Sequence, residues 1–101
     1  MPSKPQNLSE NVEAKTTTSV FVVWDPPVGD ESHSYLVVWF QKGADAKNDT
    51  VTNTSINISG LEPGQMYSIT VYTLINDVKS RGVNGIFSTS KCPRENIYYC
   101  Y

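Results

Sequence analysis

The sequence predicts an all-β domain in which two antiparallel sheets pack face to face as a sandwich. Several short segments alternate apolar and polar side chains, which is the period of two that a half-buried strand shows. No segment carries the sustained apolar spacing of an amphipathic helix, and Gly, Pro, Asn and Asp separate the alternating runs. About seven short strands in roughly 90 residues are typical of a two-sheet sandwich with Greek-key connections.

The first expected strands lie before residue 25. Leu8 and Val12 are the apolar anchors of a short strand after Pro5. Residues 18–24 form the first strong alternating run, and successive side chains along it point to opposite faces. The Asp-Pro-Pro segment that follows Trp24 ends this strand, because proline cannot donate to a sheet ladder.

Residues 35–40 are apolar on both faces of the next expected strand. One face is anchored by Tyr35, and the other carries Leu36, Val38 and Phe40. Either this is a central strand that is covered on each side, or the stripe of Leu36, Val38 and Phe40 points outward and contacts a partner.

The second half of the chain completes the sandwich. Residues 42–53 are polar, which indicates a loop or a weak edge strand whose charges discourage strand addition. Residues 54–59 and 66–74 are alternating runs on either side of a Gly-Leu-Glu-Pro-Gly turn. We expect a polar hairpin loop at residues 76–82 and a last strand at residues 83–89.

The last strand has an open register. Gly82 and Gly85 permit a β-bulge, and a bulge exchanges the faces of the residues that follow it. Either Ile86 or Phe87 therefore faces the core.

The pattern of several of these residues resembles that of the fibronectin type III family. The segment Gly-Leu-Glu-Pro-Gly-Gln-Met-Tyr that ends at Tyr67 looks like the family's tyrosine corner, Trp24 matches its buried strand-B tryptophan and Tyr35 its strand-C tyrosine. The match covers about residues 5–90. It implies a seven-stranded immunoglobulin-like sandwich with this core: Trp24, Tyr35, Leu61, Tyr67, Ile69 and Val71.

Length and charge restrict the class of protein. At 101 residues the chain holds one domain, with residues 1–4 expected to be a disordered extension that lacks the apolar stretch of a signal peptide. A net charge of −2, with Lys and Arg scattered, gives no basic surface for nucleic acid. No apolar run approaches the roughly 20 residues that span a bilayer. We expect a monomer in isolation with no direct membrane insertion.

Four Asn-x-Ser/Thr sequons favour passage through the secretory pathway, where each would mark chain that a glycan can reach. They begin at Asn7, Asn48, Asn53 and Asn57.

The sequence offers few residues suited to catalysis or cofactor binding. His33 is the single histidine, in a polar loop with Asp30 and Glu31, and exposed loop residues provide no oriented base or oxyanion pocket. The acidic residues have no EF-hand spacing, and Cys92, Cys100 and His33 lack the number and spacing of a zinc site. We expect no catalytic residue, no metal and no cofactor.

Two loops are the expected binding surface, because a sandwich presents its loops in clusters at its ends. They span residues 26–34 and 75–82, and the second lacks the acid of an Arg-Gly-Asp motif. The charged candidates for protein contact are Asp30, Glu31, His33, Asp77, Lys79 and Arg81.

The segment 91–101 lies beyond the family match. It holds Cys92 and Cys100, with seven residues between them, and several aromatic residues. Three alternatives stay open: a linker to a following domain, a disulfide-closed loop that packs on the sandwich, or part of another domain.

The resemblance implies an extracellular module of a larger cell-surface receptor, most similar to the repeats of receptor-type tyrosine phosphatases. Such a module binds a protein ligand or neighbouring domains, and any catalytic domain lies elsewhere in the parent chain. A spacer repeat without a ligand, an accessory domain of a multidomain enzyme and an engineered binder are the alternatives; the scattered sequons argue against the last. The Trp-Ser-x-Trp-Ser box of cytokine receptors is absent before the end of the last strand.

Overall fold

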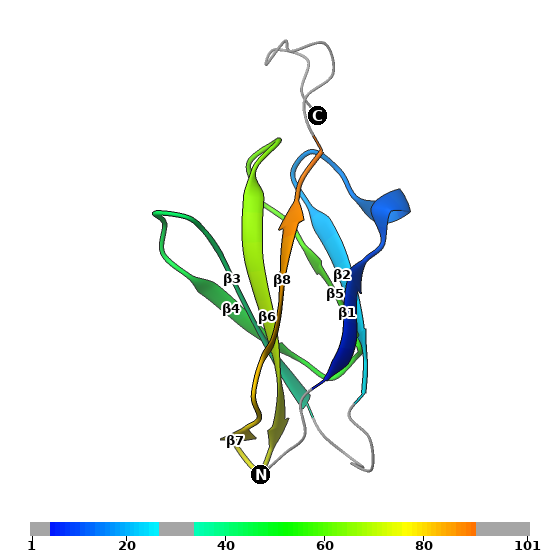
Figure 1. Ribbon diagram of the computed structural model, residues 1–101, viewed down its shortest axis with the longest axis vertical. Helices are drawn as coiled ribbons and strands as arrows, with labels where there is room; N and C mark the ends of the chain where they lie inside the picture. Colours follow the sequence, from blue (N-terminus) through cyan, green and yellow to red (C-terminus); the bar gives the residue numbers. More distant parts are fainter. Residues whose placement is uncertain (1–4, 27–33, 91–101) are drawn as a thin grey trace.

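The structure, a computed structural model, describes residues 5–26 and 34–90. These residues form two antiparallel sheets that face each other, so the predicted all-β sandwich is confirmed (Figure 1). One sheet has the order β1-β2-β5, and the other has the order β4-β3-β6-β7 with β8 also paired to β6. The elements are β1 (Gln6–Glu10), the 3-10 turn η1 (Val12–Ala14), β2 (Val20–Asp25), β3 (Ser34–Gln41), β4 (Lys47–Val51), β5 (Ser55–Ile58), β6 (Met66–Ile75), β7 (Val78–Lys79) and β8 (Val83–Ser88).

The polar hairpin expected at residues 76–82 contains a strand of its own. β6 continues through Ile75 and pairs with Val78 of β7 across a two-residue turn. Both turn residues, Asn76 and Asp77, have positive φ, of 51° and 63°. Two positive φ angles define the type I′ turn that matches strand twist. This hairpin explains why the described residues form eight strands where the sequence predicts seven.

Val12 is not a strand anchor, which corrects the expectation from the sequence. It begins η1 and is 63% exposed. The side chain of Asn11 accepts a hydrogen bond from the backbone N–H of Glu13, and the backbone N–H of Asn11 donates to the carbonyl of Phe21. The chain therefore turns directly after β1, whereas Leu8 within β1 packs against the core.

The core lies between the sheets and is built from alternate residues of β2, β3 and β6. Trp24 of the smaller sheet meets Tyr35 of the larger sheet edge to face, with ring centroids 5.3 Å apart. The buried hydrophobic residues are Val20, Val22, Trp24, Tyr35, Val37, Ile58, Leu61, Tyr67, Ile69 and Val71, and they include all six residues of the expected core.

The register of β8 decides between its two apolar neighbours. Tyr67 pairs with Phe87 and Ser68 pairs with Ile86, so Phe87 faces the core side with Tyr67 and Ile86 faces outward. A Cβ atom at Gly85 would lie 2.6 Å from the ring of Phe87. The aromatic ring therefore covers the backbone at Gly85, and any larger residue there would require the ring to move.

A network of hydrogen bonds holds the turn before β6. The backbone N–H of Glu62 donates to the Tyr67 hydroxyl at 2.8 Å, which is the tyrosine corner that the sequence resembles. The Thr89 hydroxyl donates to the Glu62 carbonyl at 2.6 Å and accepts from the Gln65 N–H at 3.1 Å. The turn is thus tied to the residues directly after β8.

Candidate functional site

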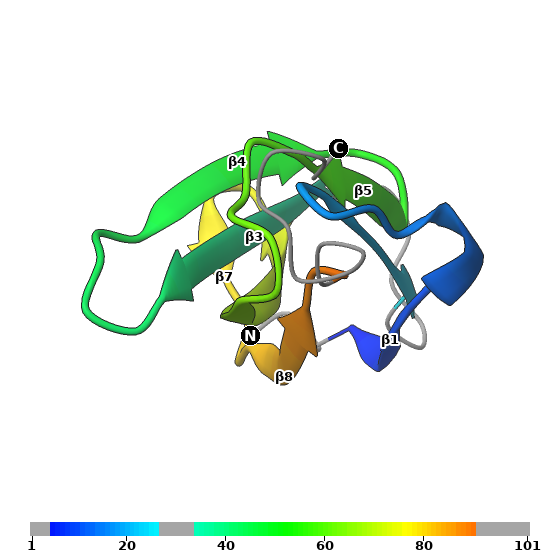
Figure 2. The same ribbon diagram turned by 90° about the horizontal axis from the view of Figure 1, so that it is seen from above.

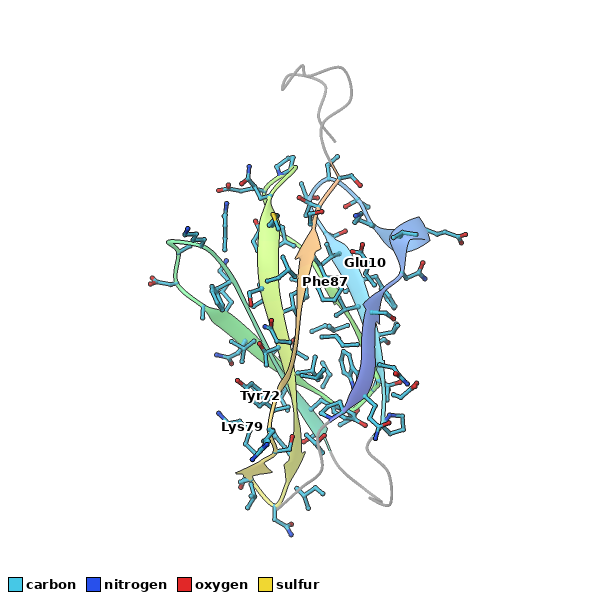
Figure 3. All side chains as sticks on the ribbon, viewed as in Figure 1. Glu10, Tyr72, Lys79 and Phe87 are labelled. Carbon is cyan, nitrogen blue, oxygen red and sulfur yellow. The ribbon has the colours of Figure 1, made fainter. Side chains whose placement is uncertain are left out.

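Three of the six charged residues expected to bind a partner lie at the β6–β7 hairpin and just after it. Asp77, Lys79 and Arg81 are exposed there. The ammonium nitrogen of Lys79 lies 4.5 Å from the ring centroid of Tyr72, so this cation rests on an aromatic face (Figure 3). The other three candidates, Asp30, Glu31 and His33, lie outside the described residues, as do both cysteines, Cys92 and Cys100.

The four sequon asparagines are all exposed. Asn7 has a φ of 56° and its amide donates to the Asp25 carboxylate at 2.6 Å. Asn48 lies on β4, Asn53 in the loop that follows β4, and Asn57 on β5. Three of the four sequons therefore fall on one continuous stretch of chain, from β4 to β5.

Side chains of the types that bind metal ions do not cluster in residues 5–26 and 34–90. No group of three or more His, Cys, Asp or Glu side chains gathers there at metal-binding distances. Among these described residues the one helical element is the three-residue η1. No helix there has both the length and the hydropathy that crossing a bilayer needs.

An apolar groove lies on the outer face of the larger sheet. Phe40 of β3 pairs with Ser68 of β6, and Ser68 pairs in turn with Ile86 of β8, so one row crosses three strands. Met66 lies one step further along the same face of β6. The exposed fractions are 40% for Phe40, 65% for Met66 and 55% for Ile86.

The groove forms because a small residue separates large ones. Ser68 is the floor between Phe40 and Ile86, and the open volume is about 670 Å³. At the rim, the Gln41 side-chain amide donates to the Gln65 side-chain carbonyl at 3.1 Å. Lys42 is the charged residue among those that line the groove. The site therefore offers apolar contact beside one cation.

The strand stripe that the sequence singled out is divided by the fold. Leu36 and Val38 are half-buried, and Phe40 is exposed and lines the groove. Met66 and Ile86 were missed as site residues. Alternation counted back from the inward-facing Tyr67 places Met66 on the outer face, so that signal was available. For Ile86 the open register of β8 hid the signal.

A polar strip separates the groove from the Lys79 end of the face. The side-chain amide of Asn84 donates to the hydroxyls of Ser68, at 2.9 Å, and Thr70, at 2.7 Å. These bonds connect β8 to β6 on the outer face. The apolar groove is therefore a bounded site and does not extend into the hairpin.

Comparison with known proteins bears on the fold and the family of this chain. The family model for the fibronectin type III domain matches residues 3–85. Human receptor-type tyrosine-protein phosphatase H is 31% identical over 83 residues, which cover 79% of this chain and 7% of that protein. A computationally redesigned β-sandwich protein has a TM-score of 0.76 at 26% identity, covering 90% of this chain and 98% of its own. The FN5 domain of Drosophila Lar has a TM-score of 0.74 at 24% identity, covering 89% and 98%.

These matches differ in what they cover. The chain spans 7% of the length of its curated relative and nearly the whole length of the two solved structures. The matched unit is thus a single repeat module, and the family model covers most of the chain. The resemblance found at Trp24, Tyr35 and Tyr67 is confirmed, and the chain belongs to the fibronectin type III domain family.

Proposed function

We propose that this domain is an extracellular protein-binding repeat of a larger cell-surface receptor, and that it docks its partner in the groove at Phe40, Met66 and Ile86. One observation carries the proposal: three large apolar side chains are exposed together on one sheet face. The relative among receptor-type tyrosine phosphatases supports the receptor context. Chemistry in such a parent chain belongs to another domain.

The lining of the groove defines the partner it fits. An apolar or aromatic side chain fills the space above Ser68, between Phe40 and Ile86. A carboxylate on the partner complements Lys42, the charged residue of the lining. The occupant is therefore a protein segment that presents an apolar anchor next to an acidic residue.

The proposal is tested by cross-linking from inside and outside the groove. A photoreactive amino acid replaces Met66 in one variant and Val78 in a control, because Val78 is also exposed, at 52%, but lies on β7. The domain is joined artificially into a tetramer and added to living cells. We expect a specific covalent adduct with a cell-surface protein from position 66 only. The partner identified from that adduct should bind the Ile86→Ser domain at least tenfold more weakly, and the Val78→Ser domain unchanged. Equal adducts from both positions contradict the proposal.

A spacer role is the second candidate. The described chain enters at the start of β1 at one end of the sandwich and leaves after β8 at the other, so that domains join end to end (Figure 1). The same experiment separates the two functions, because a pure spacer yields no specific adduct from position 66 on any cell that binds the full ectodomain.

A further inference from the structure

The outer face of the smaller sheet carries a pairing that the docking face does not involve. Phe21 of β2 is the register partner of Asn57 of β5. Both point away from the core, because Val20, Val22 and Ile58 beside them are buried. Asn57 is exposed and Phe21 is half-buried.

We propose that Asn57 carries an N-linked glycan whose first sugar packs on the ring of Phe21. Directly opposed side chains on antiparallel strands have Cβ atoms only about 4.5–5.5 Å apart. A pyranose attached to the Asn57 amide therefore lies over its neighbour. The sugar presents a face of C–H groups, and an aromatic face carries the negative charge of its quadrupole, so the two surfaces are complementary.

The other sequons lack this partner. Asn48 pairs with Val38, an aliphatic residue on the outer face of the larger sheet. Asn53 lies in a loop between strands, and the Asn7 amide already donates to Asp25. Asn57 alone among the four is the register partner of an aromatic residue.

The position of β5 gives this glycan a structural role. β5 is an edge strand in the described sheet, and its sequence Ser-Ile-Asn-Ile has neither a charge nor a proline to deter pairing with another chain. The edge strand of the other sheet, β4, lies along the same side of the sandwich and carries Lys47 and Asp49 (Figure 2). A glycan on Asn57 protects the edge that charge leaves open.

Secretion of the chain from mammalian cells allows both parts of the proposal to be tested. Glycopeptide mass spectrometry measures occupancy at Asn57, and an endoglycosidase then trims every glycan to one sugar. Melting temperatures are compared for the unsubstituted domain, Asn57→Gln, Phe21→Leu and the double variant. Asn53→Gln is the matched control for loss of a glycan in a loop, and bacterial protein is the control for the substitutions themselves.

We expect Asn57 to be occupied and Asn57→Gln to lower the melting temperature by roughly 2–6 °C, the scale of one cross-strand contact in a domain of this size. Asn57→Gln should cause no such decrease when it is added to the Phe21→Leu variant, and none in bacterial protein. Asn53→Gln should not lower the melting temperature either. Nuclear Overhauser cross-peaks between the Phe21 ring and the first sugar give a second measurement that needs no variant.

An unoccupied Asn57 overturns the proposal, as does the absence of those cross-peaks, or a decrease that is equal with and without the Phe21→Leu substitution. None of these outcomes bears on the docking face, because Phe21 and Asn57 lie on the other sheet.

Discussion

At the scale of single residues, Tyr67 combines two contributions that separate substitutions can resolve. The residue is 6% exposed and its ring fills the core, while its hydroxyl accepts a hydrogen bond from the backbone N–H of Glu62. A hydrogen bond of this kind contributes about 1 kcal/mol net, whereas loss of a buried aromatic side chain costs about 3–5 kcal/mol. The hydroxyl fixes the turn, and the ring supplies most of the stability.

We therefore expect Tyr67→Phe to lower the free energy of unfolding by about 1–2 kcal/mol, because the ring stays and the N–H of Glu62 loses its acceptor. Urea unfolding followed by tryptophan fluorescence measures the change. Tyr72→Phe is the matched control, since Tyr72 is half-buried on the outer face and its ring contact with Lys79 does not require the hydroxyl. Equal effects of the two substitutions would show that the corner hydrogen bond is not the cause.

At the scale of elements, the β6–β7 hairpin holds two residues in the left-handed region. A side chain with a Cβ atom is strained there, and glycine relieves the strain. Asn is tolerated best among the others, so Asn76 suits its place, and Asp77 with a φ of 63° is the less suited of the pair.

We expect Asp77→Gly to raise the free energy of unfolding by about 0.5–1 kcal/mol and Asp77→Val to lower it by at least about 1 kcal/mol, because a β-branched residue at positive φ is strained. Thermal and urea unfolding of both variants check the signs. Asp45→Gly is the control, since Asp45 is an exposed loop aspartate without positive φ. Stabilisation by Asp45→Gly of the same size would refute the conformational argument.

Most of the strands follow from local patterns, because alternation reports directly which face of a strand is buried. Residues 18–24 and 66–74 were predicted nearly to their ends, and the segment before Tyr67 indicated both the turn and the crossing. η1 and β7 were not predicted. η1 depends on a side-chain cap from Asn11 and β7 on a turn with two positive φ angles, and neither feature produces a periodic pattern of apolar residues in the sequence.

The candidate groove was predictable only in part, because it depends on pairing between distant strands. Phe40 stood in an apolar stripe of the sequence, yet its neighbours Met66 and Ile86 come from β6 and β8. Only the register of three strands brings Phe40 and Ile86 to the two sides of Ser68, next to Met66 on the same strand. Exposure of a single apolar residue is common, so none of the three indicated a site alone.

At the scale of the whole molecule, the two sheets have separate outer faces and a shared interior. The groove lies on the outer face of one sheet and the Phe21–Asn57 pair on the outer face of the other. Substitutions of the exposed groove residues should therefore leave folding nearly intact. Substitutions at the contact between the sheets should affect every strand, because a domain of this size unfolds as one cooperative unit.

We expect Ile86→Ser to change the free energy of unfolding by no more than about 0.5 kcal/mol, since Ile86 is 55% exposed and faces outward. Its effect on partner binding is then separable from folding. Urea unfolding measures the change, and Val71→Ser on the neighbouring strand is the comparison, because Val71 is 0% exposed and should cost several kcal/mol. A loss at Ile86 as large as that at Val71 would mean that the groove residues belong to the core.

The contact between Trp24 and Tyr35 is the most direct link between the sheets, since the rings meet at an interplanar angle of 69°. We expect Trp24→Ala to lower the free energy of unfolding by about 3–5 kcal/mol, a large part of the roughly 5–15 kcal/mol available to a small domain.

Milder leucine substitutions allow a double-mutant cycle, in which Trp24→Leu and Tyr35→Leu should couple by about 0.5–1.5 kcal/mol. Trp24→Leu combined with Met66→Leu should instead be additive, because Met66 lies at the far end of β6 from Thr73, the register partner of Tyr35. Additivity of the first pair would mean that the sheets are held by buried area alone and not by the geometry of these two rings.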